Sequence, residues 1–276
     1  MTENNHNESR RQLADVLLEL DELVRTLRHE CPWDREQGVE DIVTHTLEET
    51  YELIDAAHGG QGGEVIGELG DILFHIFFLA SLAGEKGWGD LADVTRGIID
   101  KLVLRHPHVF GDAEAATPAD VVEGWEKTKR DKEGRTGIFH DVPASMPSPL
   151  YAQRLQARAA AVGFDWQDAE PVFEKIEEET AELKYALAAE EPGPEGTDKK
   201  RGPETEAYHE TGDMLFAVVN LARKLRVDPE LALRSASLRF QHRVEGAVRL
   251  AADDGEEFSR LPQDRQEEYY QRAKKL

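Results

Sequence analysis

One acidic pattern occurs twice in this sequence, and the internal repeat constrains the fold more than any other feature. Residues 47–53 read LEETYEL and residues 67–74 read GELGDILF; residues 177–183 (EEETAEL) and 209–216 (HETGDMLF) repeat the two runs in the same order. An internal repeat indicates related structural units and decides how the rest of a sequence is interpreted. The offsets are 178 − 48 = 130 and 210 − 68 = 142. We therefore expect two related units, the second with a longer inner loop.

The acids of each pattern are spaced to meet on paired helices. The three glutamates of the first run, at i, i+1 and i+4, share one helix face, and the two acids of the second run, at i and i+3, share another. Carboxylates brought together beside apolar residues repel one another unless protonated or bridged by a cation. Oxygen ligands favour Mg²⁺ or Mn²⁺ over zinc or copper. The ten acids are Glu48, Glu49, Glu52, Glu68 and Asp71, then Glu178, Glu179, Glu182, Glu210 and Asp213.

A single E-E-x-x-E string is a weak indication, since most glutamate-rich helices are solvated surfaces. Pairing with a second acidic helix, recurrence, and the small residues Gly67 and Gly70, which would permit close helix approach, favour a metal site here. The string from Glu206 to His209 resembles the E-x-x-H element of di-iron bundles. Its only counterpart, at residues 3–6, lies in the polar N-terminal tail, so the di-iron interpretation is disfavoured.

The composition restricts the partners. With 33 basic and 56 acidic residues the net charge is −23, which argues against a nucleic-acid polymer or an anionic membrane as partner. A nucleotide remains compatible if metal ions lie between its phosphates and the protein. The single cysteine, Cys31, precludes an intrachain disulfide and suggests a reducing compartment. No stretch has the uninterrupted run of about 20 apolar residues that spans a membrane, so we expect a soluble, cytoplasmic protein.

Apolar residues recurring every three or four positions, without an alternating strand pattern, predict an all-α chain. Helices are expected at 12–29, 64–85, 91–105, 150–162, 205–225, 228–252 and 263–275. The helix that contains Glu48, Glu49 and Glu52 should end at about residue 57. We predict a disordered tail at 1–9, a first unit at 10–133, a linker at 134–147, a second unit at 148–276, and a mobile loop at 190–204.

Basic and aromatic residues recur at i, i+4 after each acidic pair of helices. Beside a metal cluster, two cationic side chains are suited to phosphate oxygens, whereas an isolated pair is more often a salt bridge or a helix-terminal cation. An aromatic ring near a lysine could stack on a base, or simply pack beside a surface lysine. The residues are Lys101, Arg105, Trp125 and Lys129, then Arg239, Arg243, Tyr270 and Lys274. His106 and His108, around Pro107, are interpreted as a polar turn that closes a helix.

The ordered motifs resemble the MazG family of all-α nucleoside triphosphate pyrophosphohydrolases in its two-repeat form. Besides the acidic runs, the resemblance rests on the CPWD sequence at 31–34, RHPHVF at 105–110 and GFDW at 163–166, and it covers nearly the whole chain. It implies two tandem units with cores of the four-helix-bundle type. It also implies a homodimer, because the helices of one unit do not complete a bundle alone.

The resemblance further implies hydrolysis of a nucleoside triphosphate to the monophosphate and pyrophosphate, in house-cleaning or control of the nucleotide pool. Glu48 and Glu178 would then orient or deprotonate the attacking water. The other acids would hold Mg²⁺, namely Glu49, Glu52, Glu68 and Asp71, and Glu179, Glu182, Glu210 and Asp213. Arg239 and Tyr270 stand where family members often have lysine and tryptophan, so the sequence departs from the family pattern at these two positions while keeping the charge and the aromatic ring.

Two rival functions remain at this stage. A dimeric helical scaffold could sense nucleotides without hydrolysing them, although such a protein has no need of ionised acids beside a core. A nucleotidase of different regiochemistry would release phosphate instead of pyrophosphate. Pyrophosphate release with and without Mg²⁺ separates the first rival from the enzyme, and identification of the products separates the second.

Overall fold

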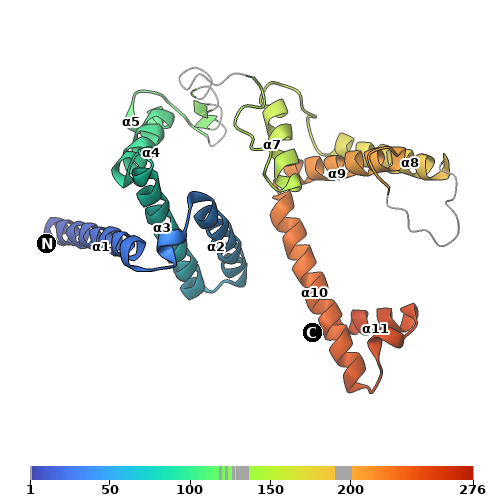
Figure 1. The fold of residues 1–276 in the computed structure, drawn as a ribbon. Helices are drawn as coiled ribbons and strands as arrows, with labels where there is room; N and C mark the ends of the chain where they lie inside the picture. Colours follow the sequence, from blue (N-terminus) through green and yellow to red (C-terminus); the bar gives the residue numbers. More distant parts are fainter. Residues whose placement is uncertain are drawn as a thin grey trace. The chain divides into compact units, whose positions relative to one another are not determined.

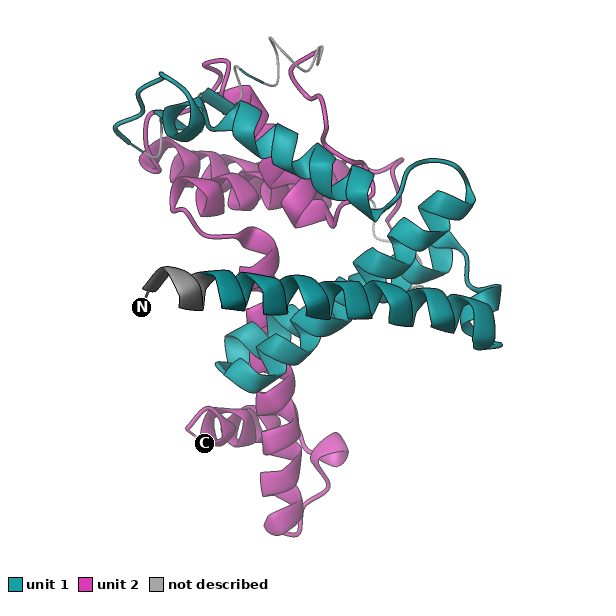
Figure 2. Ribbon diagram, turned by 90° about the vertical axis from the view of Figure 1, so that its left-hand side faces the viewer, with its two compact units in different colours: residues 1–128 teal, residues 129–276 magenta. Residues whose placement is uncertain are grey.

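The chain is all-α, as predicted. The computed structural model describes residues 2–117, 120, 121, 124, 125, 128, 137–189 and 201–275, with side chains from residue 7 on, and this part of the chain forms helices without a strand. It divides into two compact units, residues 1–128 and 129–276 (Figures 1 and 2). The division lies a few residues before the expected linker. Lys129, the start of the linker and most of the loop at 190–204 lie outside the described residues.

Unit 1 is built around the second helix of its acidic pair. Its elements are α1 (Thr2–Glu30), η1 (Asp34–Glu36), α2 (Val39–Gly59), α3 (Gly62–Glu85), α4 (Leu91–Arg105) and α5 (Pro107–Phe110). Both α1 and α2 pack on α3, and the core between them consists of Val24, Ile42, Phe77, Phe78 and Leu82. Gly60 ends α2 with a φ of 68°, a left-handed conformation that glycine adopts without strain. The short loop that follows returns the chain along α2.

Two expectations about unit 1 differ from the structure. Instead of a disordered tail at 1–9, α1 starts at Thr2, because these residues contain no proline or glycine that would interrupt a helix. In addition, the sequence pattern predicts no membrane span, yet α3 is long and apolar enough to cross a membrane, with a mean hydropathy of 1.7 in its most apolar window. The few acids in the helix do not lower its mean hydropathy enough to prevent a span. A single such helix is weak support for a membrane span, and α3 supplies three residues of the unit 1 core.

Several apolar side chains of unit 1 are left exposed. The apolar stripe of α4 packs little against the rest of its unit, and part of the apolar face of α1 is also open to solvent. The exposed residues on these two helices include Leu13, Val16, Leu18, Leu23, Val94, Ile98, Ile99, Leu102 and Val103. Amphipathic helices normally bury such a stripe. The two helices therefore present apolar surface that remains available to a further partner.

Unit 2 has the same acidic hairpin but a more extended ending. Its elements are α7 (Ser148–Ala160), α8 (Glu170–Ala189), α9 (Glu206–Lys224), α10 (Pro229–Asp253), η2 (Phe258–Arg260) and α11 (Gln263–Ala273). The acidic helices α8 and α9 pack along each other, and α7 packs on α9. Asp228 caps α10, since its carboxylate accepts from the backbone N–H of Leu231 at 3.0 Å and Pro229 occupies the first turn.

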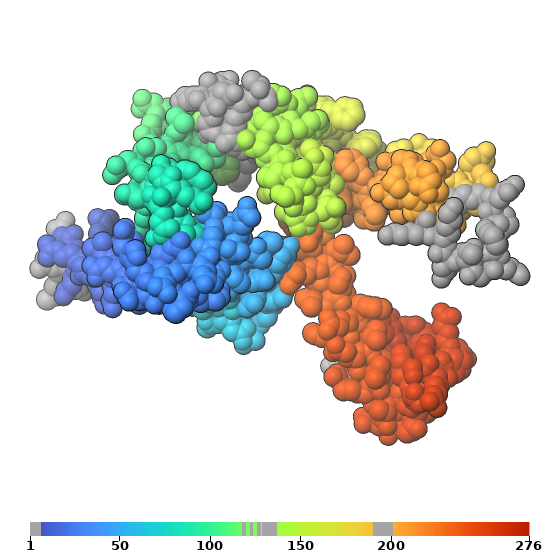
Figure 3. Space-filling model, in the orientation of Figure 1, coloured from blue at the N-terminus to red at the C-terminus, as the bar shows by residue number. Residues whose placement is uncertain are grey.

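The last two helices form a lobe of their own. The C-terminal part of α10 and α11 bury Ala247, Ala251, Tyr269 and Ala273 between them, and Figure 3 shows this lobe in orange and red at the far end of α10 from α9. Gly246 allows the close contact, because a Cβ there would lie 3.2 Å from Cβ of Ala273. We call α11 and the α10 segment 239–253 the C-terminal lobe.

Candidate metal centres

The acidic centre of unit 2 joins α8 to α9. Glu179 on α8 and Glu210 and Asp213 on α9 each place a carboxylate oxygen within 4.8 Å of the others. Glu179 is only 5% exposed, Glu210 is half-buried and Asp213 faces solvent. Three oxygen donors at this separation, one of them buried, fit a hard divalent cation. The helix spacing predicted from the sequence therefore does bring these acids together.

Unit 1 contains a second centre of the same composition. Glu49 on α2 and Glu68 and Asp71 on α3 bring their carboxylate oxygens within 4.8 Å of one another. Glu49 and Glu68 are half-buried, and Asp71 is exposed. The one difference in burial is that Glu49 is more accessible than Glu179.

Desolvation, together with crowding of the carboxylates, raises the pKa of one acid in each centre. The pKa of Glu210 is raised first by desolvation, then by the negative charges of Glu182, Glu179 and Asp213. The pKa of Glu68 is raised in the same way, by desolvation and then by Glu52, Glu49 and Asp71. In both shifts the like charges add to desolvation, and a bound cation would relieve that repulsion.

The remaining predicted acids lie at the edges of the two centres. Glu52 and Glu182 are exposed and are near enough to raise the pKa of Glu68 and Glu210, but neither belongs to its group of three oxygens. Glu48 and Glu178 are exposed as well. Each has a cationic or titratable neighbour: Nδ1 of His45 lies 3.0 Å from Glu48, and Nζ of Lys175 lies 3.1 Å from Glu178.

Sequence reasoning missed two residues next to these centres. Lys175 bridges Glu178 and Glu179, with 2.7 Å between its Nζ and Oε1 of Glu179. His75, one turn after Asp71, is buried with no partner for Nδ1, and its ring centre lies 6.3 Å from that of His45. Burial, and next the charge of His45, lower the pKa of His75. Their positions one turn from motif acids were the available indication.

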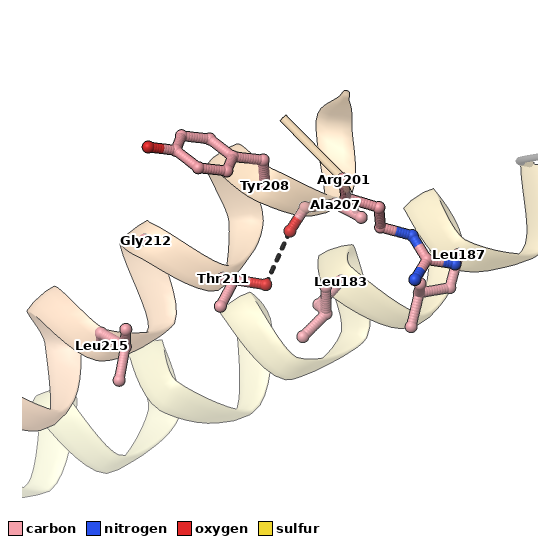
Figure 4. Close-up of a pocket in the computed structure, with 8 residues that line it drawn as sticks. All are labelled: Leu183, Leu187, Arg201, Ala207, Tyr208, Thr211, Gly212 and Leu215. Carbon is pink, nitrogen blue, oxygen red and sulfur yellow. Dashed lines mark hydrogen bonds between the residues drawn. The ribbon is translucent and has the colours of Figure 1, made fainter. Parts of the chain in front are cut away.

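The acidic hairpin of unit 2 borders two cavities. One, of about 500 Å³, is mainly apolar; Leu183, Leu187, Gly212 and Leu215 contribute to it, and Thr211 donates to the carbonyl of Ala207 beside it (Figure 4). The other, of about 630 Å³, includes Glu182, Glu206 and Glu210. Only the second cavity therefore reaches residues of the acidic centre.

The structure does not support the role expected for the motif glycines. A Cβ added to Gly67, Gly70 or Gly212 would meet nothing within 4 Å. Close approach of helices within the described chain therefore does not require glycine at these positions.

The predicted substrate-binding residues of unit 2 gather in or beside the C-terminal lobe. The ring of Tyr270 lies 6.0 Å from that of Phe240, and Nζ of Lys274 lies 4.9 Å from the Tyr270 ring centre. Arg239 donates to Ser235 on its own helix, and Arg243 is half-buried further along α10. Because α11 packs on α10 at its far end from α9 (Figure 1), unit 2 does not bring this set to its own acidic centre.

The corresponding set of unit 1 is only partly described. Lys101 is exposed and Arg105 half-buried on α4. The Trp125 ring lies 5.2 Å from that of His106, and its Nε1 is buried without a hydrogen-bond partner. His106 caps α4 and its Nδ1 lies 2.7 Å from the Leu102 carbonyl, which agrees with the polar turn expected there. His209 contacts the carbonyl of Pro203 at 2.9 Å, an arrangement unlike a di-iron ligand.

Fold and centres together define an all-α protein with clustered carboxylates on paired helices. Residues 37–110 match a family model described as the MazG nucleotide pyrophosphohydrolase domain. The chain is 38% identical over 264 residues to a nucleoside triphosphate pyrophosphohydrolase of Escherichia coli K12, covering 95% of this chain and 97% of that protein. It is 39% identical over 246 residues to the nucleoside triphosphate pyrophosphohydrolase/pyrophosphatase MazG of Thermotoga maritima, covering 88% and 89%. The chain therefore belongs to the MazG family.

Proposed function

We propose that the two acidic centres of this nucleoside triphosphate pyrophosphohydrolase hold Mg²⁺, with Mn²⁺ as an alternative, and that hydrolysis to the monophosphate and pyrophosphate takes place there. The observation that carries the proposal is the meeting of three carboxylates from two helices in each unit, within 4.8 Å. Glu49, Glu68 and Asp71 form one ligand set, and Glu52 supports it from the edge. Glu179, Glu210 and Asp213 form the other, with Glu182 at its edge.

The chain's own groups supply the remaining chemistry. When bound, the cation neutralises phosphate charge and acidifies a water. Glu178 and Glu48 are exposed carboxylates directly beside ligand residues, so each can accept a hydrogen bond from the water and orient it toward the α-phosphorus. Cationic side chains such as Arg243 and Lys274 would stabilise the departing pyrophosphate.

We also propose that the enzyme is a homodimer. The apolar stripes of α1 and α4 are exposed within one chain, and so are Leu215, Phe216, Leu233, Phe240 and Val248 in unit 2. Apolar surface of this extent is typical of protein interfaces. A second chain could cover it and could bring a C-terminal lobe to an acidic centre. The net charge of −23 supports a nucleotide as substrate over a nucleic-acid polymer or an anionic membrane, and we propose that the enzyme acts in the cytoplasm.

The centres can be tested one at a time in the full-length protein. Asp71→Asn and Asp213→Asn each remove one ligand charge while keeping the side-chain shape, and the double variant disables both units. We expect Mg²⁺-dependent pyrophosphate release from nucleoside triphosphates to be lost in the double variant. The single variants assign turnover to one unit or to both. Asp253→Asn, an exposed position on α10, is the matched control.

Undiminished pyrophosphate release by the double variant would contradict the proposal. Identification of the products completes the test, because inorganic phosphate as the first product would indicate cleavage at a different bond. Retained helicity in circular dichroism separates loss of ligands from loss of fold.

A further inference from the structure

Unit 2 contains a cavity outside the acidic centre whose walls are aromatic and whose interior carries two buried amides. The cavity has a volume of about 580 Å³ and lies between α7, α9 and the segments next to α7. Phe139, Phe164, Trp166 and Phe216 supply aromatic surface, while Gln156 and Asn220 are only 7% and 5% exposed. A mostly apolar cavity with a few fixed polar groups is the usual form of a small-molecule site.

The amide of Gln156 has an acceptor without a partner. Its Nε2 donates to the backbone carbonyl of Phe216 at 2.8 Å, and its Oε1 is buried without a hydrogen bond. The orientation of this amide is fixed, because a carbonyl can only accept and so must face the NH₂ end. A buried polar atom without a partner is unfavourable, and a ligand N–H in the cavity would supply the missing partner.

Asn220 faces the cavity from the opposite helix with the complementary group. Its Oδ1 accepts from Nε and Nη2 of Arg223 at 3.0 and 2.7 Å, so Nδ2 is the donor end. Arg223 is held in turn by Asp165, with 3.1 Å between Nη1 and Oδ2. The cavity therefore combines a fixed acceptor and a fixed donor with flat aromatic surfaces.

Unit 1 fills the same place with apolar side chains. The CPWD and GFDW sequences are offset by 163 − 31 = 132, which aligns Gln156 with Val24, and the offset of 142 aligns Asn220 with Phe78. Val24 and Phe78 are 1% and 0% exposed and belong to one core cluster. Two contacts that are apolar in unit 1 have thus become amides in unit 2. Core stability alone does not favour the exchange at Gln156, because its buried Oε1 has no hydrogen bond and burying such an atom is unfavourable.

The position of the cavity relates it to the acidic centre. Asp213, Phe216 and Asn220 follow one another at i, i+3 and i+7 on α9, hence on one face, and seven residues of helix span about 10 Å. A sugar separates the heterocyclic base of a nucleotide from its first phosphate. A nucleotide whose phosphates lie at Asp213 can therefore extend its base along α9 towards Asn220.

We infer that this cavity is the base-recognition site of unit 2, in which a planar heterocycle stacks on aromatic side chains, donates an N–H to Oε1 of Gln156 and accepts from Nδ2 of Asn220. The inference rests on the proposed function for the phosphate end of the ligand. It also assigns base selectivity to unit 2 and not to unit 1, whose matching positions are closed by Val24 and Phe78.

Binding of nucleoside monophosphates to the full-length protein, measured by calorimetry without divalent cations, tests the cavity apart from catalysis. We expect the wild type to bind some bases more tightly than others. Gln156→Leu and Asn220→Phe should each weaken binding of the preferred monophosphate by about tenfold or more, the value of a hydrogen bond to a buried partner. Asn220→Phe introduces the side chain that unit 1 has at the matching position. Gln153→Leu is the matched control, since its amide lies on the same helix and donates outside the cavity, to Val227 at 3.4 Å.

The outcomes separate this inference from the proposed function. Absence of monophosphate binding by the wild type, or equal binding by Gln156→Leu and Gln153→Leu, overturns the inference, whatever the rate of pyrophosphate release. Selective binding lost in Gln156→Leu and Asn220→Phe supports it even if no triphosphate is hydrolysed. If Asn220→Phe loses helicity, Gln156→Leu becomes the deciding variant, because leucine has nearly the same volume as glutamine.

Discussion

Lys175 and Glu179 meet across one turn of α8, with 2.7 Å between the ammonium Nζ and Oε1 of the carboxylate. Glu179 is the buried ligand of the unit 2 centre, and the ion pair raises the pKa of Lys175, first through Glu179 and then through Glu178. A lysine thus provides the positive charge that a metal ion would otherwise supply. In unit 1 the offset of 130 places His45 at this position.

Removing that ammonium group should change metal affinity. Lys175→Met deletes a positive charge that repels a divalent cation and competes for Oε1 of Glu179. We expect Mn²⁺ to bind unit 2 more tightly, by a factor on the order of ten, and the metal-free variant to unfold at a lower temperature. Calorimetry in the Asp71→Asn background isolates unit 2. Lys184→Met, exposed on the same helix, is the control, and equal affinities in the two variants would contradict this account.

The ion pairs of Asp165 with Arg223 and Lys224 should make the stability of unit 2 depend on pH. Burial alone would raise the pKa of Asp165, but hydrogen bonds and charges from Arg223 and Lys224 outweigh it and lower the pKa. A folded-state pKa below the unfolded one stabilises the protein at pH values above the unfolded pKa of about 3.9. That contribution is lost as the pH falls through the folded pKa.

Asp165→Asn should therefore lower the free energy of unfolding by about 1–3 kcal/mol near pH 7, as expected for hydrogen bonds between charged groups. Urea titrations at a series of pH values should show the difference from wild type constant above about pH 5 and shrinking in more acidic solution. A difference that persists unchanged at pH 2 would show that the ionised carboxylate is not its source.

The stability of unit 1 should depend strongly on one core side chain, that of Phe78. It is fully buried among Val24, Ile42, Phe77 and Leu82, so Phe78→Ala removes a large apolar group and leaves a cavity. We expect the free energy of unfolding of unit 1 to fall by about 3–5 kcal/mol. Phe110→Ala, at an exposed position on α5, should change it by less than about 0.5 kcal/mol. Similar effects of the two substitutions in denaturant titrations would mean that Phe78 is not central to the core.

Local sequence patterns were sufficient for the helices and for most of each acidic group. Spacing of i, i+3 and i+4 places Glu179 and Asp213 on facing helix surfaces, and glycine or proline marks most helix ends. The same patterns did not indicate which of Glu179 and Glu182 joins Glu210 and Asp213, because Glu179 and Glu182 lie one turn apart on α8. Only the packing of α8 on α9 distinguishes them. Nor did they single out Gln156, since a polar residue in a helix becomes informative only when its burial is known.

The separation between the C-terminal lobe and the acidic centre leads to a prediction about two chains. If Lys274 serves the centre of a second copy, Lys274→Met and Asp213→Asn should each be inactive alone, in an Asp71→Asn background that silences unit 1, yet complement each other when the two variants are co-expressed. Random pairing gives mixed dimers in half of the population, each with one complete site. Pyrophosphate release should then recover to about a quarter of the activity of the Asp71→Asn parent. Because a lobe that serves its own chain leaves both sites of every mixed dimer incomplete, activity no higher than that of the separate variants would show that the lobe does not act across the dimer.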